Sequence, residues 1–262
     1  MDIIQFLQAS VDPENESEFR LLVNNKCVKY ITIDGGLYDS DDMCFGPSLV
    51  SLIPPLPSGD WNEGPISRNP ATGNPHFATV SKTHFPGITR LWHTIQIDHL
   101  ELRMGQNLRS NVYEATCSRF SSTIIVKLAR FPWEVPQLER ETMAYEWVDG
   151  QQIGPGFLGH LIEEGRAIGF VMDRIVGCRH ATPNDFSLCR LALSKLHQLG
   201  IKHGDINKHD FLIHDGKATL IDFDSASRAV SASELEREIL DLPDQLRDTS
   251  ERGGRIIESG PS

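Results

Sequence analysis

The chain has 262 residues, of which 39% are hydrophobic and 23% are charged, which is ordinary for a globular protein with a substantial core. Its formal net charge of -11 argues against binding to nucleic acid or to an anionic membrane surface. The five cysteines form no C-x-x-C pair, so they predict reduced thiols and neither a disulfide framework nor a zinc site. With no signal-peptide pattern at residues 1–6 and no long apolar run, we expect a soluble cytoplasmic protein.

The first hundred residues carry fewer structural signals than the rest of the chain. Residues 27–33 have strand character. Residues 52–86 contain seven prolines, which exclude a regular helix and predict an extended segment that runs over a surface. Because Trp61 and Phe77 give this stretch apolar anchors, we expect residues 1–99 to pack as an extension on the downstream core.

A strand followed by small side chains comes next. Residues 99–104 alternate apolar and polar side chains and predict a strand. Gly105, Asn107 and Ser110 follow, before a second strand that contains Val112. Small residues in such a turn let a backbone approach phosphate oxygens closely. Since only one of the three is glycine, the pattern by itself indicates no more than an ordinary strand–turn–strand.

A strand and a helix then place a lysine and a glutamate at related positions. Residues 122–127 form a β-branched run that ends in Lys127, and residues 135–148 have helical character. One face of the helix carries Leu138, Glu141, Tyr145 and Val148. A lone carboxylate in an apolar stripe is costly to bury, and Lys127 is the obvious counter-ion. The pattern therefore predicts a Lys127–Glu141 ion pair.

Three further elements lead to the most informative part of the chain. Residues 157–162 and 167–172 predict a hairpin. Residues 185–199 predict an amphipathic helix that ends at Gly200. This helix would deliver the chain into the segment that begins at His203.

Residues 203–224 combine carboxylates with a short hairpin. Asp205 and Asp210 precede two apolar strands joined by an Asp-Gly turn, and Asp222 stands where the second strand ends. Carboxylates that converge repel one another unless a proton or a cation lies between them, so a hard divalent metal is a natural ligand. Acidic residues are also common in turns and at strand ends, so the pattern alone leaves both interpretations open.

The spacing within this segment resembles the protein-kinase-like superfamily. The similarity rests on His203-x-Asp205, a metal-ligand position five residues later, an apolar hairpin and then Asp222-Phe223, which resemble the catalytic loop and the Asp-Phe-Gly segment of kinases. His-Gly-Asp, in place of His-Arg-Asp, is typical of aminoglycoside phosphotransferases and small atypical kinases. The layout is also similar to that of a group of fungal kinase-like proteins, and the resemblance covers about residues 100–247.

The resemblance implies an α+β, two-lobed protein-kinase-like fold, with an antiparallel-sheet N-lobe that carries one helix and a reduced helical C-lobe. We expect an extra N-terminal segment over residues 1–99, the N-lobe over 100–176, a minimal C-lobe over 177–249 and a frayed tail over 250–262. A helix over residues 234–247 would close the C-lobe.

The resemblance also implies roles for individual residues. Asp205 would accept or orient the proton of the attacking hydroxyl group, and Lys127, held by Glu141, would bind the α and β phosphates of ATP. Asp210 and Asp222 would hold Mg²⁺ or Mn²⁺. The residues expected to contact the nucleotide are Gly105, Asn107, Ser110, Val112, Lys127, Met172, Asp173, Ile175 and Leu212.

Two of these expectations concern the walls of the nucleotide site. Met172 would be the gatekeeper, and the backbone of residues 173–175 would be the hinge that holds adenine. Arg109 stands at the tip of the phosphate loop, where it would either add a positive charge at the phosphates or, as we expect, be solvated.

Three functional hypotheses remain. The first is an ATP- and magnesium-dependent phosphotransferase that acts on a hydroxyl group of a small molecule or a protein. The second is a pseudokinase or interaction module, because Asp210 replaces the usual Asn, Asp224 replaces the glycine of Asp-Phe-Gly and the glycine loop is degraded. The third is other chemistry in the same pocket, on a nucleotide or a metabolite. The acceptor and the oligomeric state are not determined by the sequence.

Overall fold

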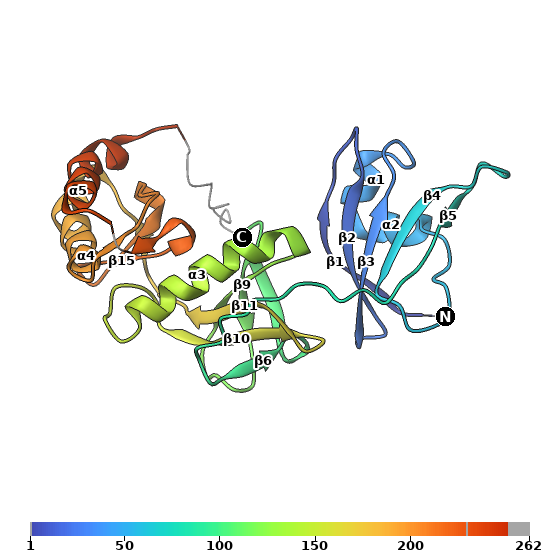
Figure 1. The fold of residues 1–262 in the computed structure, drawn as a ribbon, viewed down its shortest axis with the longest axis horizontal. Helices are drawn as coiled ribbons and strands as arrows, with labels where there is room; N and C mark the ends of the chain where they lie inside the picture. Colours follow the sequence, from blue (N-terminus) through green and yellow to red (C-terminus); the bar gives the residue numbers. More distant parts are fainter. Residues whose placement is uncertain (1, 229, 251–262) are drawn as a thin grey trace. The chain divides into compact units, whose positions relative to one another are not determined.

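The computed structural model describes residues 2–228 and 230–250 of the chain. These residues form two compact units: the first reaches to Pro86 and includes Arg130–Pro132, and the second contains Gly87–Ala129 and the residues from Trp133 onward (Figure 1). The frayed tail predicted over 250–262 lies, from residue 251, outside the described residues. No helix in the described part of the chain is both long and apolar enough to span a membrane.

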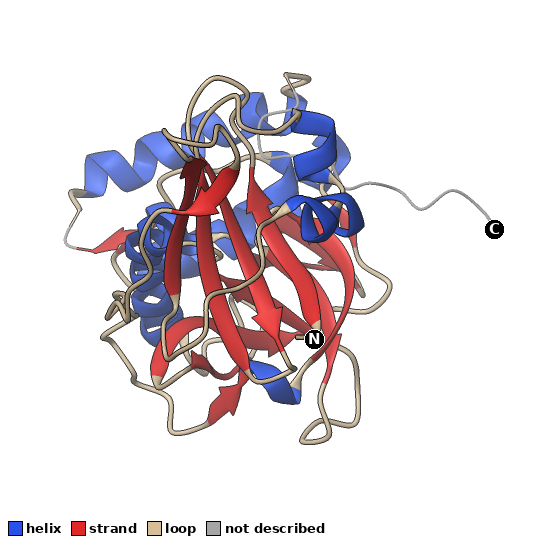
Figure 2. Cartoon of the chain, turned by 90° about the vertical axis from the view of Figure 1, so that its right-hand side faces the viewer, coloured by secondary structure: helices blue, strands red, loops and turns tan. Residues whose placement is uncertain are grey.

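The first unit is a five-stranded sheet with two short helices. Its strands are β1 (Ile4–Ser10), β2 (Ser17–Val23), β3 (Cys27–Ile33), β4 (Glu63–Arg68) and β5 (Pro75–Phe77). They are hydrogen-bonded in sequence order, and all pairs are antiparallel except β3 with β4. Figure 2 shows strands of the chain side by side. Parallel neighbours need a crossover connection, and this one contains α1 (Ser40–Cys44) and α2 (Gly46–Leu52).

This sheet has a hydrophobic core of its own. The buried side chains are Phe19, Leu21, Ile31, Ile33, Met43, Leu49, Ile53 and Ile66. The strand predicted over residues 27–33 is confirmed with the same bounds. The proline-rich stretch is extended and partly joins the sheet as β4 and β5, and Trp61 anchors it by donating from Nε1 to the Pro57 carbonyl oxygen at 2.8 Å. The packing of residues 1–99 on the kinase-like core stays a prediction.

The second unit begins with a six-stranded sheet. Its strands are β6 (Gln96–Asp98), β7 (Arg103–Arg109), β8 (Val112–Thr116), β9 (Ile124–Leu128), β10 (Phe157–Glu163) and β11 (Arg166–Asp173). The spatial order is β6-β10-β11-β9-β8-β7, and every pair is antiparallel except β6 with β10. The strand predicted over residues 99–104 is wrong at its start, because His99–Glu101 form a 3₁₀ turn that Asp98 caps.

Alternation along the strands separates two faces of this sheet. On β9, Ile124, Val126 and Leu128 are buried in one cluster, so the intervening Lys127 points to the opposite face. On β11, Phe170 and Met172 belong to that opposite face, where they pack with the helix α3. Because side chains alternate between the two faces along β9, the Lys127 side chain points toward α3.

Helix α3 (Val135–Val148) covers this face of the sheet and has the predicted bounds (Figure 1). The whole predicted stripe of Leu138, Glu141, Tyr145 and Val148 is buried. The outer side of the helix is bound by the segment before β6, where Arg90 pairs with Glu146 through two hydrogen bonds of 2.7 and 2.8 Å. Trp92 Nε1 donates to the carbonyl oxygen of Thr142 at 3.0 Å. These contacts hold α3 in place.

The remaining elements form a small C-terminal lobe. They are β12 (Arg179–His180), α4 (Phe186–Gln198), β13 (Ile201–Lys202), β14 (Phe211–His214), β15 (Lys217–Leu220), β16 (Ser227–Arg228) and α5 (Ala232–Arg247). Strands β14 and β15 are the predicted hairpin, and its turn residues Asp215 and Gly216 have φ angles of 45° and 68°, as a type I′ turn requires. Helix α4 packs against both α5 and β15.

These features confirm the predicted fold class. The second unit has an antiparallel-rich sheet that carries one helix, followed by a lobe with two helices and a short hairpin. This is a reduced, two-lobed kinase-like architecture.

Candidate active site

A cavity of about 260 Å³ opens between the sheet of the second unit and the β14–β15 hairpin. The predicted site residues that line it are Val112, Lys127, Glu141, Met172, Asp173, Ile175, Leu212 and Asp222. The predicted site residues outside its lining are Gly105, Asn107, Ser110, Asp205 and Asp210. The cavity thus brings together Lys127, Glu141, Asp222 and the expected adenine pocket, but its lining includes neither the glycine-loop positions nor Asp205 and Asp210.

The sheet register explains the roof of this cavity. Val112 on β8 lies opposite Lys127 on β9, and Ile125 on β9 lies opposite Met172 on β11. Directly paired residues on one face of a sheet lie about 5 Å apart, so the four side chains form a continuous surface. Ile125 was missed by the sequence analysis, although its position two residues before Lys127 places it on the same face.

Gly105 and Asn107 lie within a strand. Both belong to β7, which extends to Arg109 and has irregular register between Met104 and Arg109. A two-residue turn at Ser110 and Asn111 joins β7 to β8. Gly105, Asn107 and Ser110 lie outside the cavity lining, and their expected contact with the nucleotide stays a prediction.

Lys127 and Glu141 form the predicted ion pair, and both are deeply buried. Lys127 Nζ lies 2.6 Å from Glu141 Oε2, and the two residues are 5% and 1% exposed. Burial opposes the charge of Lys127, but Glu141 and Asp222 outweigh it and raise the lysine pKa above its ordinary value. Burial raises the pKa of Glu141 to about 7, against the lowering effect of Lys127. The lysine therefore stays protonated between the two carboxylates.

Two cationic side chains contact the carboxylate of Asp222. Lys127 Nζ lies 2.6 Å from Asp222 Oδ1, and an Arg109 guanidinium nitrogen lies 3.1 Å from Asp222 Oδ2. Burial would raise the pKa of Asp222, but Lys127 and Arg109 lower it below its ordinary range. The expectation that Arg109 is solvated is therefore wrong, because the extended end of β7 carries its side chain to this carboxylate.

The backbone at Asp222 is held in an uncommon conformation. Its φ and ψ angles are 66° and 60°, the left-handed region that residues other than glycine rarely occupy. The next side chain, Phe223, is fully buried and packs edge-on against Tyr145 at 5.3 Å between ring centroids. His203 Nε2 donates to the carbonyl oxygen of Ile221 at 3.0 Å. These anchors fix the direction of the Asp222 carboxylate.

Gly204 has a structural reason to replace the arginine of the common kinase motif. Its φ angle is +92°, and a Cβ atom there would collide with the carbonyl oxygen of Ser225. Any other residue would strain the backbone and push the two segments apart. The His-Gly-Asp variant thus follows from the close approach of the catalytic loop to the segment after Asp222.

Asp210 is a buried carboxyl with one unsatisfied oxygen. It is 1% exposed, its Oδ2 accepts a hydrogen bond from the Asn207 backbone N–H at 3.0 Å, and its Oδ1 has no partner among the described residues. Burial and the nearby Asp222 charge raise its pKa to about 8. An unpartnered buried oxygen is costly, so this position favours a proton or a cation.

Asp210 and Asp222 could supply one or two carboxylate ligands to a divalent cation. In the described part of the chain, no group of three or more His, Cys, Asp or Glu side chains is arranged to hold a metal ion, so Asp205, Asp210 and Asp222 do not form a three-carboxylate metal site. Asp210 offers a buried, unpartnered oxygen close enough to Asp222 for their charges to interact. Mg²⁺ commonly binds one or two carboxylates and takes its other ligands from water and phosphates.

Glu238 holds the catalytic loop and was missed by the sequence analysis. This α5 residue is buried and accepts hydrogen bonds from the backbone N–H groups of His203 at 3.0 Å and Gly204 at 2.7 Å. Its third contact is His197 Nε2, at 2.7 Å. Burial opposes ionisation, but these three donors lower the pKa of Glu238. In the sequence, Glu238 is one of several acidic residues on a predicted helix, and no local pattern indicates that it binds the catalytic loop.

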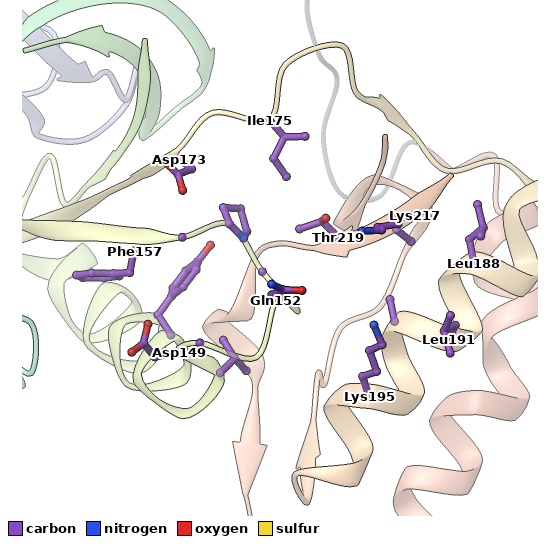
Figure 3. A pocket seen from close by; sticks show the side chains of 18 of the residues that line it. Asp149, Gln152, Phe157, Asp173, Ile175, Leu188, Leu191, Lys195, Lys217 and Thr219 are labelled. Carbon is purple, nitrogen blue, oxygen red and sulfur yellow. The ribbon is translucent and has the colours of Figure 1, made fainter. Parts of the chain in front are cut away.

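A second cavity of about 580 Å³ lies beside the expected hinge (Figure 3). It is walled by Leu188, Leu191 and Lys195 of α4 and by Thr219 of β15, and it shares Asp173 and Ile175 with the smaller cavity. Neither Lys127 nor Asp222 lines it. We therefore place the candidate active site in the smaller cavity, where the charged groups converge.

Comparisons with known proteins place similarity in the same region. The family model of the lipopolysaccharide kinase (Kdo/WaaP) family matches residues 188–243, the stretch from α4 into α5 that contains Asp205, Asp210 and Asp222. A curated relative, the "Probable bifunctional tRNA threonylcarbamoyladenosine biosynthesis protein" of Methanoculleus marisnigri, is 36% identical over 85 residues. The chain is kinase-like.

The similarity is local. The match to the Methanoculleus relative covers 31% of this chain and 16% of that protein. Together with the family match, it supports the protein-kinase-like superfamily and a phosphotransferase of kinase type.

Proposed function

We propose that the kinase-like chain is an ATP- and divalent-metal-dependent phosphotransferase whose acceptor is a hydroxyl group. The observation that carries this proposal is the position of Lys127, with Nζ 2.6 Å from both Glu141 and Asp222 at the wall of the 260 Å³ cavity. A buried lysine that two carboxylates keep protonated presents a fixed positive charge to an anionic ligand. Phosphate oxygens of a nucleotide are the natural partners.

The rest of the cavity suits the base of that nucleotide. Val112, Met172 and Leu212 provide apolar surface on which a flat ring can lie. Asp173 already donates its backbone N–H to the Gly156 carbonyl oxygen at 2.9 Å, so we assign the hinge contact to the backbone of Ile175.

Transfer requires one bond to form and one to break at the γ phosphorus. The acceptor oxygen bonds to phosphorus, the bond from phosphorus to the leaving ADP oxygen breaks, and the acceptor proton passes to Asp205. Glu238 keeps the loop of Asp205 in place through the N–H groups of His203 and Gly204. A divalent cation, held by Asp210 and Asp222, would neutralise phosphate charge when bound.

Calorimetric titration with magnesium-ATP and measurement of ADP production test this function. The parent should bind magnesium-ATP, Asp222→Asn should lose the metal-dependent part of the affinity, and Asp205→Asn should bind normally but produce no ADP. Asp215→Asn is a matched control, because this carboxylate is 83% exposed in the hairpin turn. The function is refuted if Asp222→Asn binds magnesium-ATP as tightly as the parent while remaining folded.

A nucleotide-binding module without transfer is the second candidate. It is favoured by the engagement of Asp222 with both Lys127 and Arg109 and by the absence of Gly105 and Asn107 from the cavity lining. Tight magnesium-ATP binding without ADP production, at any acceptor concentration, would select this candidate over the enzyme.

A further inference from the structure

The sheet of the second unit places two cationic side chains in one row across three strands. Arg109, the last residue of β7, lies opposite Val112 on β8, and Val112 lies opposite Lys127 on β9. Directly paired residues point to the same face of a sheet, so Arg109 and Lys127 share one face. All three residues line the cavity of about 260 Å³. The candidate active site therefore holds a second cation besides the lysine on which the proposed function rests.

These two cations contact different oxygens of one carboxylate. Lys127 Nζ lies 2.6 Å from Asp222 Oδ1, and Arg109 Nη1 lies 3.1 Å from Asp222 Oδ2. Burial and Asp222 raise the pKa of Asp210, and the charge of Arg109 opposes this rise. Because Asp210 and Asp222 are the proposed metal ligands, the Arg109 guanidinium lies at the end of the cavity that would hold the metal and the phosphates.

One nitrogen of the Arg109 guanidinium lacks an acceptor. Its Nη2 is buried and has no hydrogen-bond partner among the described residues, whereas Nη1 donates to Asp222. A buried donor without an acceptor is costly. The planar guanidinium carries five N–H donors in a fork that matches the oxygens of a phosphate group. The Nη2 position thus suits an anionic ligand that enters the cavity.

The backbone that carries Arg109 is braced by a side chain of the same hairpin. Asn107 Nδ2 donates to the carbonyl oxygens of Arg109 and Val112, and these two residues flank the turn at residues 110–111. One amide group therefore holds both sides of the turn together. This brace keeps the start of the Arg109 side chain at the roof of the cavity.

We propose that Arg109 binds the β and γ phosphates of the nucleotide, across the cavity end from Lys127. The inference rests on the proposed function and adds a phosphate-binding residue to its site. Arg109 is assigned to these two phosphates because a divalent cation on Asp210 and Asp222 would bridge them. The phosphate oxygens accept from Nη2, the donor that Asp222 does not use.

Ligands that differ in phosphate number test this assignment. ATP, AMP and adenosine are titrated separately into the full chain in a calorimeter, in buffer with EDTA, so that no metal competes with Arg109 for Asp222. The parent should bind ATP more tightly than adenosine. Arg109→Gln should weaken ATP binding by roughly tenfold or more, the effect of losing a hydrogen bond to a charged group, and bind AMP and adenosine like the parent. Equal affinity of the parent for ATP and adenosine, an equal loss for all three ligands or no loss for ATP overturns the inference.

Two further variants separate the position of the charge from its amount. Arg103→Gln is the matched control, because Arg103 lies on the same strand, is exposed and is outside the cavity lining. It makes the same change of net charge and should bind ATP like the parent. Arg109→Lys keeps the charge but loses the planar fork, so its affinity for ATP should lie between those of the parent and Arg109→Gln. An equal loss of ATP affinity in Arg103→Gln and Arg109→Gln would refute a specific contact.

The two proposals fail in different ways. If the parent binds magnesium-ATP and Asp222→Asn loses the metal-dependent affinity, but Arg109→Gln binds ATP like the parent, only the assignment of Arg109 is wrong. If the parent does not bind magnesium-ATP, the proposed function is wrong, and the assignment of Arg109 is refuted with it.

Discussion

Lys127 is expected to be the most sensitive residue for the stability of the second unit. Its Nζ neutralises Glu141, which is 1% exposed, and Asp222 at the same distance of 2.6 Å. Removing one partner of a buried ion pair typically costs about 3 to 5 kcal/mol, because the other charge is left buried alone. Lys127→Met should therefore lower the melting temperature by about 2 to 4 °C for each kcal/mol lost.

The cost should depend on pH in a defined direction. The folded-state pKa of Glu141, about 7, already exceeds its ordinary value of 4.5, so its ionisation reduces stability as the pH rises through this interval. Without Lys127, the largest influence that lowers this pKa is gone, and the carboxyl should be neutral at pH 5.5. Lys127→Met should therefore destabilise the protein much more at pH 8.5 than at pH 5.5.

Calorimetric scans of four proteins at these two pH values provide the test. Glu141→Gln should cost less than Lys127→Met, because Lys127 keeps Asp222 as a partner. The double variant should recover most of the loss seen in Lys127→Met at pH 8.5, since the unpaired carboxylate is gone. Equal destabilisation by Lys127→Met at both pH values, or strict additivity in the double variant, would refute this account of the pair.

Three further perturbations concern the acids around the cavity. In buffer with EDTA, the stability of Asp210→Asn relative to the parent should rise between about pH 4 and 8. The reason is that the Asp210 carboxyl of the folded parent has a pKa of about 8, whereas the unfolded chain releases this proton near 3.8. A pH-independent difference in melting temperature would contradict this expectation. Glu238→Gln should destabilise the protein by about 1.5 to 3 kcal/mol and reduce ADP production. The Kd for magnesium-ATP, measured by calorimetry, should not change. Weaker nucleotide binding would argue against a role of Glu238 that is confined to the catalytic loop. Arg109→Gln should strengthen Mn²⁺ binding without nucleotide by roughly tenfold, since Asp222 would lose a cation worth about 1.5 kcal/mol or more; unchanged affinity in an Mn²⁺ titration would mean that Arg109 and the metal do not compete.

The sequence by itself determined the elements whose signals are local. The bounds of α3 and β3 follow from hydrophobic periodicity within one segment. The β14–β15 turn follows from Asp215-Gly216, which tolerate positive φ angles. The Lys127–Glu141 pair was also predictable, because a carboxylate inside an apolar stripe needs a cation and Lys127 ends the preceding strand. In each case, a short stretch of residues contained the physical reason.

Only the tertiary structure decided the contacts that join distant segments. Arg109, the last residue of β7, reaches Asp222 across 113 residues. Glu238 binds Gly204 across 34 residues, and nothing in the α5 sequence distinguishes it from neighbouring surface acids. Such contacts depend on how whole elements pack, and hydrophobic patterns within single elements do not encode them.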